Sequence, residues 1–283
     1  MAVRDISHVE LYTRDKIATV DFLVSSMGFT RVADSVAFDR SSVLLRQGDA
    51  QLVVTSGWVT GKWLSEYGDG VADIAVTCDD ASETARAALT SGARVTSSPH
   101  GFPVVSGWGA VSHTLFPAAA TGSSTPPPGH KWTASPGAPE EPTGHIRRYD
   151  HIAIRLEANP LKDYAAFCAE VLGLSLVPDT RPSVGGRTAA PLVARSVSER
   201  VAFVLTTTDA HHGAGARDTH VDPEEPPGTH RLAFLADDDR SGTYEYRHPG
   251  MPQLRLCTVG HASRQEFGTV LSGLASGTRS PVG

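Results

Sequence analysis

The feature that most constrains this sequence is a pattern of one strand, one helix and three more strands that recurs along it. The first copy comprises a strand at residues 6–12, a helix at 15–27 and strands at 29–32, 42–46 and 51–55. Its strands alternate apolar and polar residues, whereas its helix carries a stripe of apolar residues and ends at Gly28. This order of elements defines a β-α-β-β-β unit.

Three further copies of the unit follow. The second has a strand at 71–77, a helix at 79–89 and later strands from 92 and from 111; the third has a strand at 149–156, a helix at 160–172 and strands at 175–178, 190–195 and 201–206. The fourth starts at His230 and is short, with a strand at 253–259 and a closing helix at 263–274. Four such units in two pairs predict an α+β fold of two curved sheets, each a half-open barrel around a cavity.

The two pairs of units are separated by a stretch of different composition. Residues 117–144 are rich in Pro, Gly, Ser and Ala and show no periodicity, which is typical of a linker, although Trp132 indicates an anchored part. We predict an N-terminal pair at residues 1–117, a linker at 118–147 and a C-terminal pair at 148–283. Whether the short fourth unit completes its sheet alone or with a second copy, in a homodimer, stays open.

Composition excludes several classes of function. The 283 residues are 40% apolar and 20% charged, which is typical of a globular protein with two ordinary domains. The net charge of −6 provides no basic surface for nucleic acid or an anionic membrane, and no apolar run is long enough to span a bilayer. Cys78, Cys168 and Cys257 are odd in number and far apart, so a disulfide framework is not expected. We expect a cytoplasmic protein that acts on a small molecule.

Two histidines occupy equivalent places in the C-terminal pair. His151 lies in the first strand of the third unit, and His230 lies at the matching point of the fourth. Because the first strands of paired units meet near one centre, both imidazoles can converge on one metal ion or one substrate. The alternative is that both are hydrogen-bonded histidines in a cavity that no longer holds metal.

Six short stretches, spread over nearly the whole chain, carry a family resemblance. They are residues 8–12, 27–29, 68–75, 109–115, 149–151 and 228–230. Together they resemble the vicinal oxygen chelate superfamily and, more narrowly, 4-hydroxyphenylpyruvate dioxygenase and 4-hydroxymandelate synthase. The resemblance implies Fe(II) held by two histidines and one glutamate, with three positions left for a 2-oxo acid and O₂. It assigns His151 and His230 as ligands and leaves His8 and Asp73 with structural roles.

The sequence departs from that family at the third ligand. The turn at residues 248–252 leads into the strand that should carry the glutamate, and Arg255 stands in its place. Arginine keeps its proton in proteins and cannot ligate a divalent cation. Glu245, Cys257 and His261 remain as candidates for the third ligand. A cysteine with two histidines would suit zinc or copper better than iron.

These residues support three functional hypotheses. The leading one is a 4-hydroxyphenylpyruvate dioxygenase-like enzyme of specialised metabolism, acting on a small aromatic or amino-acid-derived carboxylate by Fe(II) and O₂ chemistry if metal is retained. The second is a metal-independent isomerase, cyclase or lyase that uses His151, His230 and Arg255. In this second hypothesis, an Arg255 side chain that points inward binds the substrate carboxylate with two N–H groups of its planar guanidinium. An Arg255 side chain that points outward is a solvated strand residue. The third is a binding or resistance protein for a small molecule.

Overall fold

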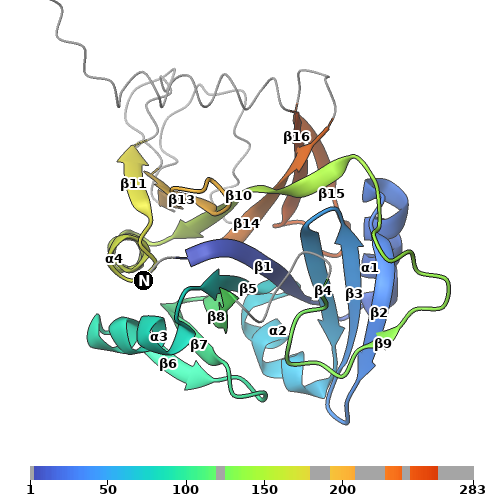
Figure 1. Cartoon of the computed structure of the whole chain (residues 1–283), viewed down its shortest axis with the longest axis horizontal. Helices are drawn as coiled ribbons and strands as arrows, with labels where there is room; N and C mark the ends of the chain where they lie inside the picture. The colour runs from blue at the N-terminus through green and yellow to red at the C-terminus, as the bar shows by residue number, and fades with distance from the viewer. Residues whose placement is uncertain (1–2, 119–124, 179–191, 208–226, 238–242, 261–283) are drawn as a thin grey trace, which may run out of the picture.

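Two β-sheets form the framework of the protein (Figure 1). The structure is a computed structural model and describes residues 3–118, 125–178, 192–207, 227–237 and 243–260. Each pair of units forms one sheet, and neither sheet closes into a barrel within these residues. The predicted α+β class with tandem βαβββ units is confirmed.

The N-terminal pair forms the larger sheet. Its first unit comprises β1 (Val3–Tyr12), α1 (Lys16–Met27), β2 (Thr30–Val36), β3 (Ser41–Gln47) and β4 (Ala50–Ser56), and its second comprises β5 (Gly70–Cys78), α3 (Ala81–Thr90), β6 (Arg94–Ser97), β7 (Pro103–Trp108) and β8 (Val111–Pro117). The strand order is β6-β7-β8-β5-β1-β4-β3-β2, so β1 and β5 pair antiparallel at the centre. The carboxylates of Asp15 and Asp80 cap α1 and α3 by accepting hydrogen bonds from backbone N–H groups.

The C-terminal pair forms a seven-stranded sheet with the same central pairing. Its elements are β10 (Ile146–Leu156), α4 (Ala158–Glu170), β11 (Ser175–Pro178), β12 (Leu192–Arg195), β13 (Ala202–Thr207), β14 (Gly228–Ala236), β15 (Thr243–Arg247) and β16 (Arg255–Gly260). The strand order is β11-β12-β13-β10-β14-β16-β15, with β10 and β14 antiparallel at the centre. The fourth unit is short, as predicted: residues 237–242 alone separate β14 from β15.

The two halves share one hydrophobic core. A continuous cluster of buried apolar residues includes side chains from both sheets and from α1, α3 and α4. At its centre, Trp108 and His113 of the N-terminal pair pack on Tyr164 and Phe167 of α4, with ring centroids between 4.5 and 5.9 Å apart. This packing uses one face of each sheet, so the other face of each sheet remains for a site.

Some elements differ from the sequence-based expectation. A 3-10 turn η1 (Trp58–Thr60) and helix α2 (Gly61–Tyr67) connect the first two units, and a short strand β9 (Thr133–Ala134) in the linker pairs with β2. Trp132 anchors the linker as predicted, because its indole N–H donates to the carbonyl of Pro127 at 2.8 Å and its ring stacks on His130.

Other expectations are not tested. The helix predicted at 263–274 lies outside the described residues, and the division into two pairs of units and a linker stays a prediction. Within the described ranges, no helix is both long and apolar enough to cross a membrane.

Candidate functional site

The candidate residues gather on one face of the C-terminal sheet, which we call the site face. In β10, Ile152 and Ile154 point into the shared core. Because side chains alternate along a strand, His151, Ala153 and Arg155 point to the opposite face. The site face is therefore the surface of the seven-stranded sheet that is turned away from the core.

The register between strands arranges the site face in two rows. The first row runs through His151, Ala233, Cys257 and Glu245. The second row runs through Ala153, Arg231, Arg255 and Arg247. Residues paired directly across neighbouring strands point to the same face, so each row is a line of adjacent side chains.

His151 is held by the residue that precedes it. Tyr149 pairs with Phe234 and His151 with Ala233, so Asp150 is an extra residue that forms a β-bulge. The carboxylate of Asp150 lies 2.8 Å from Nδ1 of His151. Because an ionised carboxylate only accepts hydrogen bonds, Nδ1 donates to Asp150, and in the neutral form of the ring Nε2 carries the lone pair.

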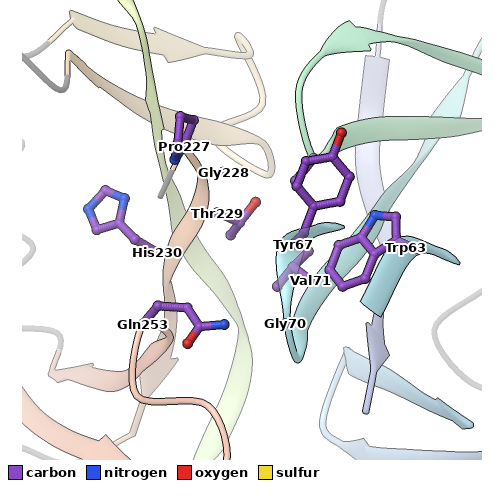
Figure 2. A pocket seen from close by; sticks show the side chains of 10 residues that line it. Trp63, Tyr67, Gly70, Val71, Pro227, Gly228, Thr229, His230 and Gln253 are labelled. Carbon is purple, nitrogen blue, oxygen red and sulfur yellow. The ribbon is translucent and has the colours of Figure 1, made fainter. Parts of the chain in front are cut away.

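His230 reaches the site face through a second bulge. Ala153 pairs with Arg231 and Ile154 with Thr229, which leaves His230 as the extra residue. Figure 2 shows the imidazole of His230 pointing away from the side to which Thr229 points. Nδ1 of His230 is buried and accepts or donates no hydrogen bond within the part of the chain that the structure describes.

The surroundings of His230 are strongly positive. Burial, followed by the charges of Arg155, Arg231 and Arg255, holds the pKa of His230 well below its usual range. Arg255 is 5% exposed and Arg155 is 1% exposed, so neither charge is fully screened by water. The ring of His230 is therefore neutral at physiological pH.

The candidates for a third ligand lie beside this positive cluster. The guanidinium of Arg247 donates to Oε1 of Glu245 at 2.7 Å, and Nη1 of Arg255 lies 4.0 Å from Oε2. Burial raises the pKa of the Cys257 thiol, which favours the protonated form that binds metals poorly. Among the described residues, no three His, Cys, Asp and Glu side chains are grouped closely enough to hold a metal ion. His261 lies outside the described residues, so the ligand assignment stays a prediction.

A small cavity lies on the other side of β14, between the two halves of the chain. Its volume is about 30 Å³, and Trp63, Tyr67, Thr229 and Gln253 line it together with the backbone of His230 (Figure 2). A space of that size holds a water molecule and no organic substrate. The cavity therefore separates α2 from β14 and does not form part of the candidate site.

The equivalent face of the N-terminal sheet has the opposite chemistry. Glu10 pairs with Asp73 in register, at the place that Ala153 and Arg231 occupy in the C-terminal sheet. Burial raises the pKa of Glu10 to about 7 and also raises the pKa of Asp73. His8, the counterpart of His151, is buried and lies 3.2 Å from the hydroxyl of Ser7. The N-terminal sheet therefore carries two acids at the repeated position where the C-terminal sheet carries an alanine and an arginine.

The comparisons with solved structures agree with this architecture. The chain superposes on a triple mutant of 4-hydroxymandelate synthase from Streptomyces coelicolor with a TM-score of 0.71 and 25% identity, over 90% of this chain and 92% of that chain. The chain has the vicinal oxygen chelate fold. It also superposes on a fusion of a xylose isomerase-like TIM barrel and 4-hydroxyphenylpyruvate dioxygenase with a TM-score of 0.63 and 18% identity, over 84% of this chain and 37% of that chain.

The vicinal oxygen chelate fold confirms the predicted resemblance, and the first neighbour carries the name of an enzyme, which supports an enzyme at a coarse level. No family model matches the sequence. The second match spans little more than a third of its neighbour's length, so it supports the fold alone.

The residues of the site face do not fit the iron centre that the resemblance implies. His151 and His230 supply two imidazoles, but the described part of the chain groups no third ligand with them. Arg255, which the sequence predicts at the third-ligand position, carries a guanidinium, and Arg231 stands next to it in register. Two positive charges beside a dication are repulsive, whereas both can form charge-assisted hydrogen bonds to an anion.

The sequence alone missed three residues of the site. Asp150 directly precedes His151, so a carboxylate next to a strand histidine was the available signal. Arg231 likewise follows His230 directly. Arg247 had no local signal, because only the register between β15 and β16 places it beside Arg255.

Proposed function

We propose that the site face binds a small carboxylate and moves a proton on it without a metal, with His151 as the acid–base group. The observation that carries the proposal is the placement of the Asp150–His151 pair next to Arg255 and Arg231, where the resemblance implies a metal ligand. The fold likeness to 4-hydroxymandelate synthase supports an enzyme that acts on a small aromatic or amino-acid-derived acid.

Each group has a distinct role in this chemistry. The guanidinium of Arg255 stays protonated, so it binds the substrate and does not act as a base. It donates two parallel hydrogen bonds, one to each oxygen of a carboxylate. Nε2 of His151, whose other nitrogen is held by Asp150, takes a proton from the carbon next to a carbonyl group. The arginine charges stabilise the enolate oxygen on which negative charge develops. His230, neutral and buried, holds the substrate by hydrogen bonds.

The test measures proton transfer directly. Phenylpyruvate is incubated with the protein in D₂O with EDTA, and the loss of its C3 proton signal is followed by NMR. The wild-type protein should accelerate this exchange, and His151→Ala should reduce the acceleration about 100-fold or more, because a positioned general base contributes about that factor. Arg255→Gln should raise KM more than it lowers kcat.

A matched control uses another histidine near the same strand. His145 is exposed and precedes β10, so His145→Ala should leave the exchange unchanged. Exchange that is equally fast in His151→Ala, or that requires added Fe(II), would overturn the proposal. Saturable binding of the acid with no exchange would instead support the binding-protein hypothesis.

A further inference from the structure

Four exposed apolar side chains gather in two neighbouring loops of the N-terminal pair. Val36 ends β2, Phe38 follows in the turn to β3, and Trp58 and Val59 belong to η1. Phe38 is 96% exposed and Trp58 is 69% exposed. We call these four residues the aromatic patch. Single apolar residues on a surface need no explanation, whereas a contiguous patch marks a surface that binds a partner.

The two loops of the patch are fixed against each other. The rings of Phe38 and Trp58 meet edge to face, with their centroids 6.4 Å apart. The backbone N–H of Val59 donates to the carbonyl of Asp39, and a Cβ on Gly57 would lie 2.3 Å from that carbonyl oxygen. Only glycine at residue 57 therefore lets the loops approach so closely. The patch is thus preformed, and binding through it requires little further ordering of the chain.

The turn within the patch carries balanced charges. The guanidinium of Arg40 donates to both carboxylate oxygens of Asp39, at 3.2 and 3.1 Å. A second copy that approaches through this turn therefore meets an ion pair and no like-charge repulsion. A nucleic acid or an anionic membrane would select a basic surface, which this turn does not provide. The partner that fits is an uncharged apolar surface, and the patch is itself such a surface.

The exposed area of the patch is large enough for self-association. A Phe or Trp side chain buries about 150–250 Å² when it is covered, so the exposed parts of Phe38 and Trp58 offer roughly 300 Å². Two copies would together bury roughly 600 Å² through these residues alone. Specific interfaces bury at least about 1,200 Å² in total. The two aromatic residues therefore provide about half of what a small specific interface needs, before Val36, Val59 and the surrounding polar residues are counted.

A two-fold axis would bring the patch onto itself. In a symmetric dimer both subunits use the same surface, so one patch supplies both sides of the interface. Because Phe38 is almost fully exposed, its ring can pack against Trp58 of a second copy. Aromatic residues are enriched at the centres of interfaces, and aromatic pairs stabilise them beyond the area that they bury.

We infer that two copies of this chain associate through the aromatic patch, with Phe38 of each copy packed against Trp58 of the other. The inference is independent of the proposed function, since the patch lies in the N-terminal pair and the site face in the C-terminal pair. It also differs from completion of the fourth unit by a second copy, which would join the C-terminal sheets.

Sedimentation equilibrium measures the association directly. The full chain should pass from monomer to dimer with a Kd of about 1–100 µM, as expected for an interface at the lower end of the size range. Phe38→Ser should raise that Kd at least about tenfold, because the substitution removes an aromatic side chain from both sides of the two-fold axis.

Two exposed valines provide a matched pair of variants. Val36 lies in the patch and is 80% exposed, whereas Val197 lies in the turn between β12 and β13 and is 94% exposed. Val36→Ser should raise the Kd about threefold or more, and Val197→Ser should leave it unchanged. Because both side chains are exposed, both variants should keep the urea midpoint of the wild-type protein, which shows that they are folded.

Charged variants of one exposed residue identify the partner as a second copy. Ala37 is exposed between Val36 and Phe38. Ala37→Glu and Ala37→Lys each place like charges on both sides of the interface, so each variant alone should dimerise at least about tenfold more weakly than the wild-type protein. An equal mixture of the two should dimerise at least about tenfold more tightly than either variant alone, because glutamate then faces lysine.

Three results would overturn the inference: a wild-type protein that stays monomeric up to about 300 µM, well above the expected Kd, a Kd that Phe38→Ser does not change, or a mixture that associates no more tightly than its components. Binding of the monomer to phosphatidylcholine vesicles, lost in Phe38→Ser, would instead assign the patch to a membrane surface.

Discussion

At the scale of single residues, Arg255 determines what the site can bind. Its distance from the turn at residues 248–252 predicts that it takes the position of the third ligand. The structure places it on β16 with 5% exposure, beside Arg231 and near Glu245. A single position thus replaces the negative charge that the resemblance implies with a positive one. The remaining part of the implied centre, His151 and His230, still faces the same side of the sheet.

A carboxylate at residue 255 should therefore create a metal site. We expect Arg255→Glu to bind Co(II) at least about tenfold more tightly than Arg255→Gln, a difference of about 1.4 kcal/mol. The glutamine variant removes the positive charge but adds no anionic ligand, so it isolates the effect of the carboxylate. Visible absorption of bound Co(II) provides the measurement, and His230→Ala in the Arg255→Glu background should abolish it. Equal Co(II) affinity of the two variants would show that residue 255 is not at the third ligand position.

At the scale of elements, the sequence predicted the units but not the contacts between their strands. Strands and helices follow from local periodicity, so β10, α4 and β14 were found near their observed positions. The bulges at Asp150 and His230 interrupt the two-residue period, so alternation alone does not give the orientation of His230. The alignment of Arg231, Arg255 and Arg247 across β14, β16 and β15 depends on register between distant segments, which no local pattern encodes.

The hairpin of β3 and β4 shows how such long-range contacts position the site. Its turn residue Gly48 has a φ of +54°, and a Cβ there would lie 2.5 Å from the carbonyl oxygen of Arg147, at the start of β10. The next residue, Asp49, donates its backbone N–H to that same carbonyl. The hairpin therefore holds the beginning of the strand that carries His151.

We expect Gly48→Ala to lower the free energy of unfolding more than a comparable glycine change. Gly109 has a φ of +66°, and no described atom lies within 4 Å of its added Cβ. Gly109→Ala should therefore cost about 1 kcal/mol, from backbone strain alone. Gly48→Ala should cost at least about 2 kcal/mol more, because the hairpin must also move away from β10. Urea unfolding followed by circular dichroism measures both, and equal costs would contradict the proposed contact.

At the scale of the whole molecule, the two halves have the same architecture, with acidic side chains on one sheet face and basic side chains on the equivalent face of the other. Glu10 and Asp73 occupy the level at which the C-terminal sheet carries Ala153 and Arg231. The net charge of −6 does not reveal this difference between the halves, since it sums over the whole chain. The halves nevertheless share one core, so a change on one side of their contact should affect both.

The contact between His113 and Tyr164 provides the test of that coupling. Burial lowers the pKa of His113 to about 4, so its ring is neutral; Nδ1 donates to the carbonyl of Ile74, and Nε2 accepts from the hydroxyl of Tyr164 at 2.9 Å. Tyr164→Phe leaves Nε2 buried without a partner among the described residues, and we expect a loss of about 1–3 kcal/mol in the free energy of unfolding. Tyr244→Phe is the control, because Tyr244 is 45% exposed.

The four tryptophans make this a test of the whole molecule, because all of them precede residue 148 while Tyr164 lies in α4. Tryptophan fluorescence therefore follows unfolding of the N-terminal pair and the linker, whereas far-ultraviolet circular dichroism follows the whole chain. If the shared core makes unfolding cooperative, Tyr164→Phe should shift both transitions to the same lower urea concentration. A fluorescence midpoint that stays at the wild-type value while the dichroism midpoint falls would show that the two halves unfold independently.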